Sequence, residues 1–117
     1  MAIDIKRAYE KPSAQDGRRI LIDRLWPRGL KKQEVAIDEW RKDLAPSDEL
    51  RRWFGHDPKR WRGFRRRYLA ELAEREEELR ELARAARDSD ITLVFGARDL
   101  KHNDAVVLKE RLEELTG

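Results

Sequence analysis

The 117-residue sequence contains no cysteine. Disulfide bonds, thiolate catalysis and cysteine-ligated zinc are therefore excluded, because each of them needs a thiol. No apolar run approaches the roughly 18 residues that a membrane-spanning helix requires, and no stretch resembles a signal peptide. We therefore expect a cytoplasmic protein that makes no membrane contact.

The sequence also lacks a large excess of charge of one sign. Lys and Arg total 27, Asp and Glu total 24, and the net charge is only +3. This balance argues against a dedicated nucleic-acid-binding protein, although a local basic patch remains open, since the chain is rich in arginine. Charged residues make up 44% and hydrophobic residues 39% of the chain, which predicts a folded protein with a densely charged surface.

The length predicts one α/β domain over residues 1–117, because the chain can build one core but not two. We expect a small mixed sheet of three to four strands, packed with one long helix in the middle of the chain and one C-terminal helix. There is no internal repeat, low-complexity tract or linker that would divide the chain.

Three segments have the pattern of strands. Ile3–Lys6 alternates apolar and charged residues, Arg18–Arg24 contains an apolar run, and Ile91–Phe95 is apolar almost throughout, as in strands covered on both faces. The turn-forming connection Lys11–Gly17 is shorter than the roughly dozen residues of a parallel crossover, so we expect the first two strands to form an antiparallel hairpin. Intervening helices predict that the second and third strands are a parallel pair. Lys31–Leu44 fits either a strand or a helical turn.

Helix signals follow. Ser47 and Gly55 predict a helix over Asp48–Phe54, capped at both ends. Asp57 and Pro58 then open a long helix that runs to Arg87. Because one straight helix would outreach so small a domain, a kink or break between Glu71 and Glu78 stays open. The last helix starts at Asn103 or Asp104 and has a core-facing stripe made of Ala105, Leu108, Leu112 and Leu115.

Two of the strands run into charged residues. Asp23 and Arg24 follow the second strand directly, and Arg98 and Asp99 follow the third after two small residues. Parallel strands end at one edge of a sheet, the edge where α/β sheets bind ligands. Arg28 comes from a turn stiffened by its neighbours, and the last helix offers its N-terminus to an anion. We therefore predict a site for a small phosphate- or carboxylate-bearing ligand, with the ligand-binding residues Arg24, Arg28, Arg98, Trp26 and Asn103.

A purely structural alternative stays open at this edge. Asp23 can pair with Arg98, and Arg24 with Asp99, as ion pairs that hold the strand ends together. A ligand site predicts a cavity between the two strand ends, whereas the structural alternative predicts two salt bridges there.

The two histidines, His56 and His102, each lie at a predicted helix start. Either can carry a proton at neutral pH, with Asp23 and Asp99 as orienting acids, so these four are the candidate catalytic residues. A ring that merely bonds a backbone carbonyl is the structural alternative. No tight ligand spacing supports a metal site, and we predict none. The sequence identifies no cofactor, oligomeric state or reaction, so whether the protein is an enzyme is left open.

Arg60–Arg67 supplies the alternative function, a nucleic-acid-binding or regulatory helix face. Arg62 and Arg66 fall opposite the apolar face of this helix, which is also what a plain solvated surface would show. Nucleic acid is therefore a possible but not a favoured partner.

Four motifs together resemble the YeaO-like family of small bacterial and archaeal proteins, a family known as a domain of unknown function: Asp-Arg-Leu-Trp-Pro-Arg-Gly from Asp23, Leu-Ala-Pro-Ser from Leu44, Trp-Phe-Gly-His-Asp-Pro from Trp53, and Ala-Arg-Asp-x-x-His-Asn from Ala97. The resemblance spans Ile3 to about Leu115. It implies a compact α/β domain and no settled reaction. More distant relatives carry a cysteine-bearing segment after the corresponding late strand, and this chain has Phe95-Gly96-Ala97 there, so thiol chemistry does not transfer. The family's motif positions in this chain are Asp23, Arg24, Trp26, Pro27, Arg28, Gly29, His56, Asp57, Pro58, Arg98, Asp99, His102 and Asn103.

Overall fold

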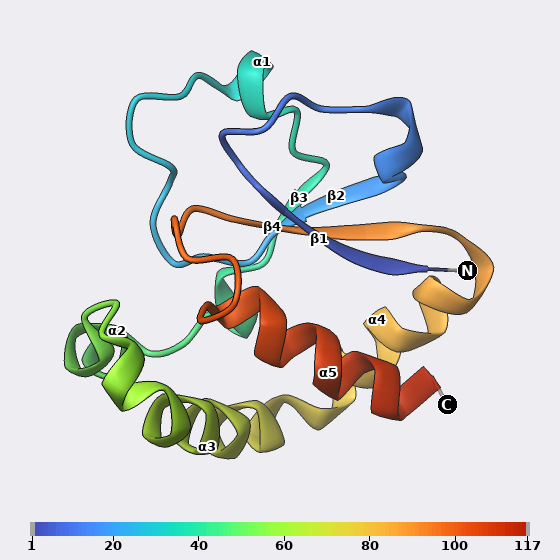
Figure 1. Cartoon of the computed structure of the whole chain (residues 1–117). Helices are drawn as coiled ribbons and strands as arrows, with labels where there is room; N and C mark the ends of the chain where they lie inside the picture. The colour runs from blue at the N-terminus through green and yellow to red at the C-terminus, as the bar shows by residue number, and fades with distance from the viewer. Residues whose placement is uncertain (1, 117) are drawn as a thin grey trace.

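The computed structural model describes residues 2–116 and has the predicted α/β architecture, with a four-stranded sheet and helices (Figure 1). The strands lie in the order β1-β4-β2-β3, and all the pairings are parallel. Their bounds are β1 Ile3–Arg7, β2 Arg18–Leu21, β3 Glu39–Trp40 and β4 Ile91–Phe95.

The predicted antiparallel hairpin is wrong, because β1 and β2 are not neighbours: each pairs in parallel with β4, which lies between them. The connection from Ala8 to Gly17 returns the chain to the starting edge of the sheet, with a short 3-10 turn, η1 (Ala14–Asp16), on the way. Ten extended residues reach about 33 Å, whereas a five-residue strand is only about 17 Å long. A helix is therefore not needed for this crossover, and the length rule for helical crossovers misleads here.

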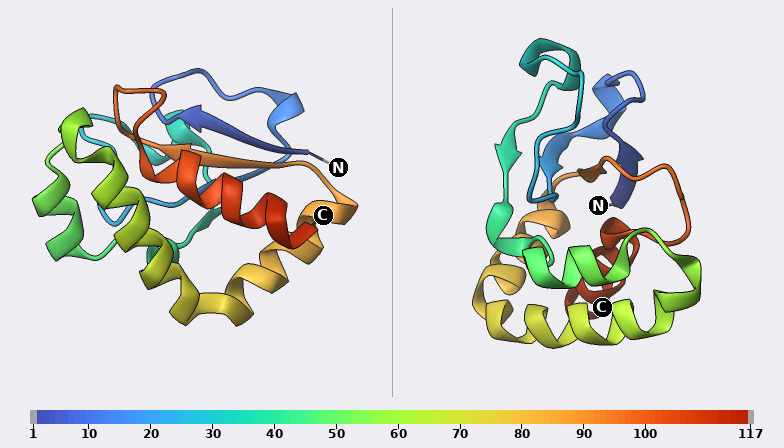
Figure 2. Two further views of the ribbon diagram at one scale, coloured as in Figure 1. Left: turned by 60° about the horizontal axis from the view of Figure 1, so that its bottom comes forward. Right: turned by 90° about the vertical axis from the view of Figure 1, so that its left-hand side faces the viewer.

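The sheet is packed on both faces, as the apolar pattern of β4 predicts. Ile91, Leu93 and Phe95 point into the larger core, which the helices of residues 48–116 cover, while Val94 joins Leu21 in a smaller core on the other face. That second face is covered by the β1–β2 connection and by α1 (Lys32–Val35) (Figures 1 and 2). All five side chains of β4 are buried, so this strand is the centre of both cores.

The short helix α2 has the predicted bounds, Asp48–Phe54. The Leu50 amide donates to Ser47 Oγ (3.1 Å) at its start, and Gly55 takes a left-handed conformation with φ of 52° at its end. The segment Lys31–Leu44 contains both of the structures that its pattern allows: α1 comes first, and the two-residue strand β3 follows.

The long central helical segment bends. It consists of α3 (Trp61–Leu72) and α4 (Glu76–Asp88), joined by the 3-10 turn η4 (Ala73–Arg75) inside the interval where a break was left open. Figure 2 shows the two helices meeting at an angle, with the C-terminal helix α5 (Asp104–Thr116) between them and the sheet. Within residues 2–116, no helix is both long and apolar enough to cross a membrane.

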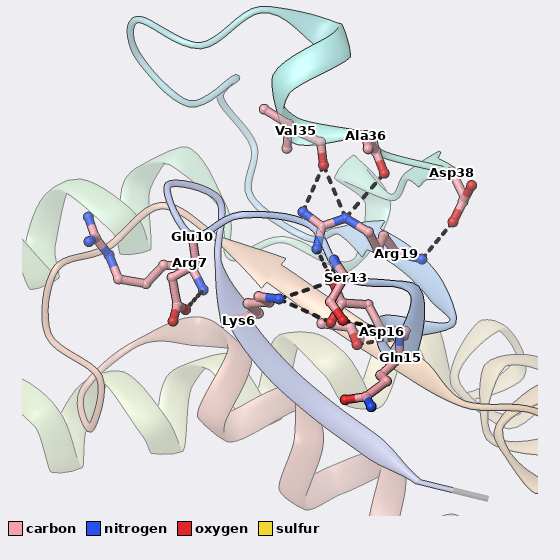
Figure 3. Close-up of polar contacts among 11 residues, drawn as sticks. Lys6, Arg7, Glu10, Ser13, Gln15, Asp16, Arg19, Val35, Ala36 and Asp38 are labelled. Carbon is pink, nitrogen blue, oxygen red and sulfur yellow. Dashed lines mark hydrogen bonds and ion pairs between the residues drawn. The ribbon is translucent and has the colours of Figure 1, made fainter.

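A buried arginine links the second face of the sheet to α1 and the β1–β2 connection, the segments that cover this face (Figure 3). Arg19 on β2 is 4% exposed; its guanidinium pairs with Asp16 (2.6 Å) and donates to the Val35 carbonyl (2.7 Å). Asp16 also pairs with Lys6 on β1 (3.1 Å). This charge network joins β1 and β2 to the segments that cover the second face of the sheet, and it holds α1 and the β1–β2 connection in place.

Candidate functional site

A cavity of about 240 Å³ opens at the carboxyl edge of the sheet, where the sequence predicts a site. β2 and β4 end there side by side, with Leu21 paired to Val94, so the segments that follow the two strands form neighbouring walls. The second half of α2, His56 in the loop after it, Phe64 on α3 and the start of α5 complete the enclosure. The predicted site residues that line it are Asp23, Arg24, Trp26, Arg28, His56, His102 and Asn103.

Three arginines line the cavity. Arg24 is half-buried and donates through Nε to the Pro46 carbonyl (3.2 Å), which directs it toward the start of α2. Arg51 on α2 pairs with Asp48 (2.6 Å), while Arg28 is exposed at the mouth. The hydrogen bond from Arg51, followed by nearby positive charges that include Arg24, lowers the pKa of Asp48 below its usual range. Arg24 and Arg51 therefore lie on the same side of the cavity, where Asp48 offsets part of their positive charge.

Arg98 does not join this group. Its side chain is exposed and it is not among the residues that line the cavity. Neither of the alternative ion pairs, Asp23 with Arg98 or Arg24 with Asp99, forms among residues 2–116. Instead, the Gly96 amide donates to Asp23 Oδ2 (2.8 Å), so a hydrogen bond from the backbone to a carboxylate ties together the segments that follow β2 and β4.

Two carboxyl groups meet in the lining of the same cavity. Asp104, the first residue of α5, hydrogen-bonds to Asp23, and both line the cavity. Loss of hydration, followed by the charge of Asp23, raises the pKa of Asp104 well above its usual range. Beneath them, the fully buried Tyr68 hydroxyl donates to the Leu44 carbonyl (2.5 Å). Asp104 therefore keeps its proton to a higher pH than an exposed aspartate does, and while it is protonated it can donate as well as accept a hydrogen bond.

The Asp99 carboxylate hydrogen-bonds to the His102 ring. The distance from His102 Nδ1 to Asp99 Oδ2 is 2.8 Å, and the imidazole packs edge-on against Trp61 with ring centroids 5.2 Å apart. Backbone amides, chiefly that of Lys101, together with His102 lower the pKa of Asp99, which stays ionised. With Nδ1 engaged, Nε2 is the ring nitrogen left for a ligand or for proton transfer.

Asn103 and Trp26 shape the walls. Asn103 is buried; its Oδ1 accepts from the Val106 amide (3.0 Å) as the cap of α5, and its Nδ2 donates to the Asp99 carbonyl (2.9 Å). Trp26 donates through Nε1 to the Leu30 carbonyl (2.7 Å). Because these polar atoms already have partners, both residues contribute surface rather than hydrogen bonds. His56 is exposed at the mouth, in a left-handed conformation with φ of 57°.

The arginines of α3 and its start are largely occupied by partners within the protein. Arg65 pairs with Glu110 (2.6 Å), Arg67 stacks on the Trp53 ring at 3.9 Å, and Arg60 bonds the Trp53 carbonyl. Arg62 and Arg66 are exposed, as on a plain solvated helix surface, and no contact among the described residues supports the nucleic-acid alternative. Within residues 2–116 there is no group of three or more His, Cys, Asp or Glu that could hold a metal ion.

Several residues that line the cavity are not among the predicted site residues. One of them is Asp104, for which an acid that opens a helix beside a sheet edge is a usable signal. Arg51 and Tyr9 carry no such signal, because their position depends on how α2 and the β1–β2 connection pack. The aromatic wall made by Phe54 and Phe64 is likewise visible only in the fold.

The family model described as the inactive DUF488-N3 subclade matches residues 2–116, and the chain belongs to this family. The chain is 45% identical over 115 residues to the uncharacterized protein YeaO of Escherichia coli (strain K12), an alignment that covers 98% of this chain and 100% of the relative. It is 38% identical over 110 residues to the uncharacterized protein Rv3073c of Mycobacterium tuberculosis (strain ATCC 25618 / H37Rv), covering 94% and 92% of the two chains. The resemblance to the YeaO-like family is thus confirmed. No solved structure matches the chain significantly.

Proposed function

We propose that this protein binds a small anionic ligand, bearing a phosphate or carboxylate group, in the cavity at the carboxyl edge of its sheet. The observation that carries the proposal is the convergence of Arg24, Arg28 and Arg51 on one cavity. Guanidinium groups form paired, charge-assisted hydrogen bonds with carboxylate and phosphate oxygens, and they remain charged at any physiological pH. His102, whose Nε2 can accept a hydrogen bond when Nδ1 donates to Asp99, and the carboxyl group of Asp104, whose pKa is raised, also line the cavity.

Binding rather than turnover is the function we favour. The family is described as an inactive subclade, and the chain has no thiol to act as a nucleophile. The pairs His102–Asp99 and Asp23–Asp104 then serve to hydrogen-bond the ligand.

The experiment is a thermal shift measurement with inorganic phosphate and acetate against chloride at equal ionic strength. A ligand at ten times its Kd stabilises the native state by about 1.4 kcal/mol, which raises Tm by roughly 5 °C for a chain of this size. We expect the shift in the wild type and in Arg98→Ala, and its loss in Arg24→Ala. Arg98 is a matched control because it is an arginine at the same edge that lies outside the cavity.

The proposal fails if neither anion raises Tm above the chloride control. It also fails if Arg24→Ala responds as the wild type does. Unfolding of each unliganded variant, followed by circular dichroism, separates loss of binding from loss of the fold.

A further inference from the structure

The exposed apolar surface of this protein gathers at the same edge as the cavity. Among residues 2–116, three large hydrophobic side chains are exposed: Tyr9 (44%), Leu25 (57%) and Leu100 (60%). Tyr9 and Leu25 line the cavity, whereas Leu100 lies on the neighbouring loop outside it. Exposure of such side chains to water is unfavourable unless a ligand or partner covers them. Apolar side chains gathered beside a cavity are typical of binding sites.

The inner wall of the cavity is aromatic. Phe54 and Phe64 stack with ring centroids 4.3 Å apart and an interplanar angle of 25°, and both line the cavity. The His56 ring is 6.3 Å from Phe54, so imidazole edges extend the ring surface toward the mouth. A flat ring placed against such a wall gains ring–ring contact beyond simple area burial.

We propose that the anionic ligand of this cavity carries an aromatic ring, as an aryl carboxylate or an aryl phosphate. The ring lies between Leu25 and the Phe54–Phe64 wall, and the charged group faces Arg24 and Arg51. This inference rests on the proposed function, since it names the class of anion that the site takes.

Size and rigidity agree with an aromatic ligand. An apolar cavity of about 150 Å³ is enough to hold benzene, so about 240 Å³ accommodates a ring together with its charged group. A rigid ring also loses little conformational freedom on binding, which favours it over a flexible chain of equal area. Arginines beside the ring add an attraction to its face.

The test is isothermal titration of the wild type with benzoate, cyclohexanecarboxylate and acetate, and with phenyl phosphate and methyl phosphate. These probes keep the charged group and change only what it is attached to. We expect each aryl probe to bind on the order of 10- to 100-fold more tightly than its methyl counterpart, from the apolar area that one ring buries. Benzoate should also bind more tightly than cyclohexanecarboxylate.

Two variants locate the ring. Leu25→Ser should lower the preference for benzoate over acetate by about threefold, because part of the apolar contact is lost, while acetate affinity stays unchanged. Leu100→Ser is the matched control: it removes an equally exposed leucine outside the cavity, so the preference should stay at the wild-type value. Both side chains are exposed, so neither change threatens the fold.

The possible failures are distinguishable. If no probe binds, the anion-binding function itself is refuted. If acetate binds as tightly as benzoate, the site takes anions but the aromatic class is wrong. Equal affinity for cyclohexanecarboxylate and benzoate also overturns the aromatic class, and an unchanged preference in Leu25→Ser overturns the placement of the ring.

Discussion

Asp104→Asn should make the protein more stable at neutral pH, although it changes a residue of the candidate site. The Asp104 carboxyl accepts from the Ala105 amide (2.9 Å) and hydrogen-bonds to Asp23 in a poorly hydrated position. An asparagine has the same shape, keeps an oxygen for the amide and offers an NH₂ group to Asp23. It therefore imitates the protonated aspartic acid without the cost of ionising it.

The sign of the pH dependence follows from the raised pKa of Asp104 in the folded protein. From about pH 4 upward the unfolded chain releases this proton while the native state keeps it, so wild-type stability falls as pH rises. The fall amounts to about 1.4 kcal/mol per pH unit and stops where the folded pKa is reached. The difference in the free energy of unfolding between Asp104→Asn and the wild type should grow with pH at the same rate and then become constant.

Urea unfolding of both proteins, at pH steps from 4 to 8, measures this difference. Asp48→Asn is the control: the hydrogen bond from Arg51 lowers the pKa of Asp48, so this group is ionised in both states above pH 5. Its free-energy difference from the wild type should stay constant from pH 5 to 8. A difference between wild type and Asp104→Asn that is likewise flat would refute the carboxyl pair.

Two further predictions concern the frame that supports the site. Arg19→Met should lower the free energy of unfolding by about 3 kcal/mol, because it leaves the buried Val35 carbonyl without its donor and removes one of the two cations paired with Asp16; chemical denaturation checks this, and Arg98→Met should be near neutral. Gly17→Ala should cost about 3 kcal/mol, since φ is 65° and the new Cβ would lie 2.3 Å from the Asp90 carbonyl oxygen. Gly29→Ala, with φ of 82° and open space around it, should cost only about 1 kcal/mol; equal losses at the two glycines would contradict the close approach.

What the sequence predicts well is local. Ser47 and Gly55 place both ends of α2 correctly, because capping depends on residues within one turn. The all-apolar pattern of Ile91–Phe95 correctly predicts a strand buried on both faces. The prediction of a hairpin is wrong because strand pairing depends on residues far apart in the chain. No residue near Lys11–Gly17 indicates that β4 will lie beside β1.

In the candidate site, too, the sequence predicts the features set locally and misses those set by packing between distant segments. Strand ends predict that Arg24 borders a cavity, since parallel topology alone brings it there. The sequence also predicts Arg98 as a ligand-binding residue, but Arg98 does not line the cavity. The direction of a loop side chain depends on the path of the chain after Gly96, which cannot be predicted from the residues there. The contact between Asp23 and Asp104 joins residues 81 positions apart in the numbering, and only the packing of α5 against the sheet creates it.

The place of β4 between β1 and β2 sets the order in which this protein can be made. During synthesis, at roughly 5–20 residues per second, β1 and β2 emerge long before Ile91–Phe95, the segment that both of them need. Until then only the two-residue ladder between β2 and β3 is available, and so small a ladder is unstable alone. In the nascent chain, the edges of β1 and β2 that pair with β4 therefore stay unpaired until the last quarter of the chain is made. That last quarter completes the sheet and the ligand cavity together.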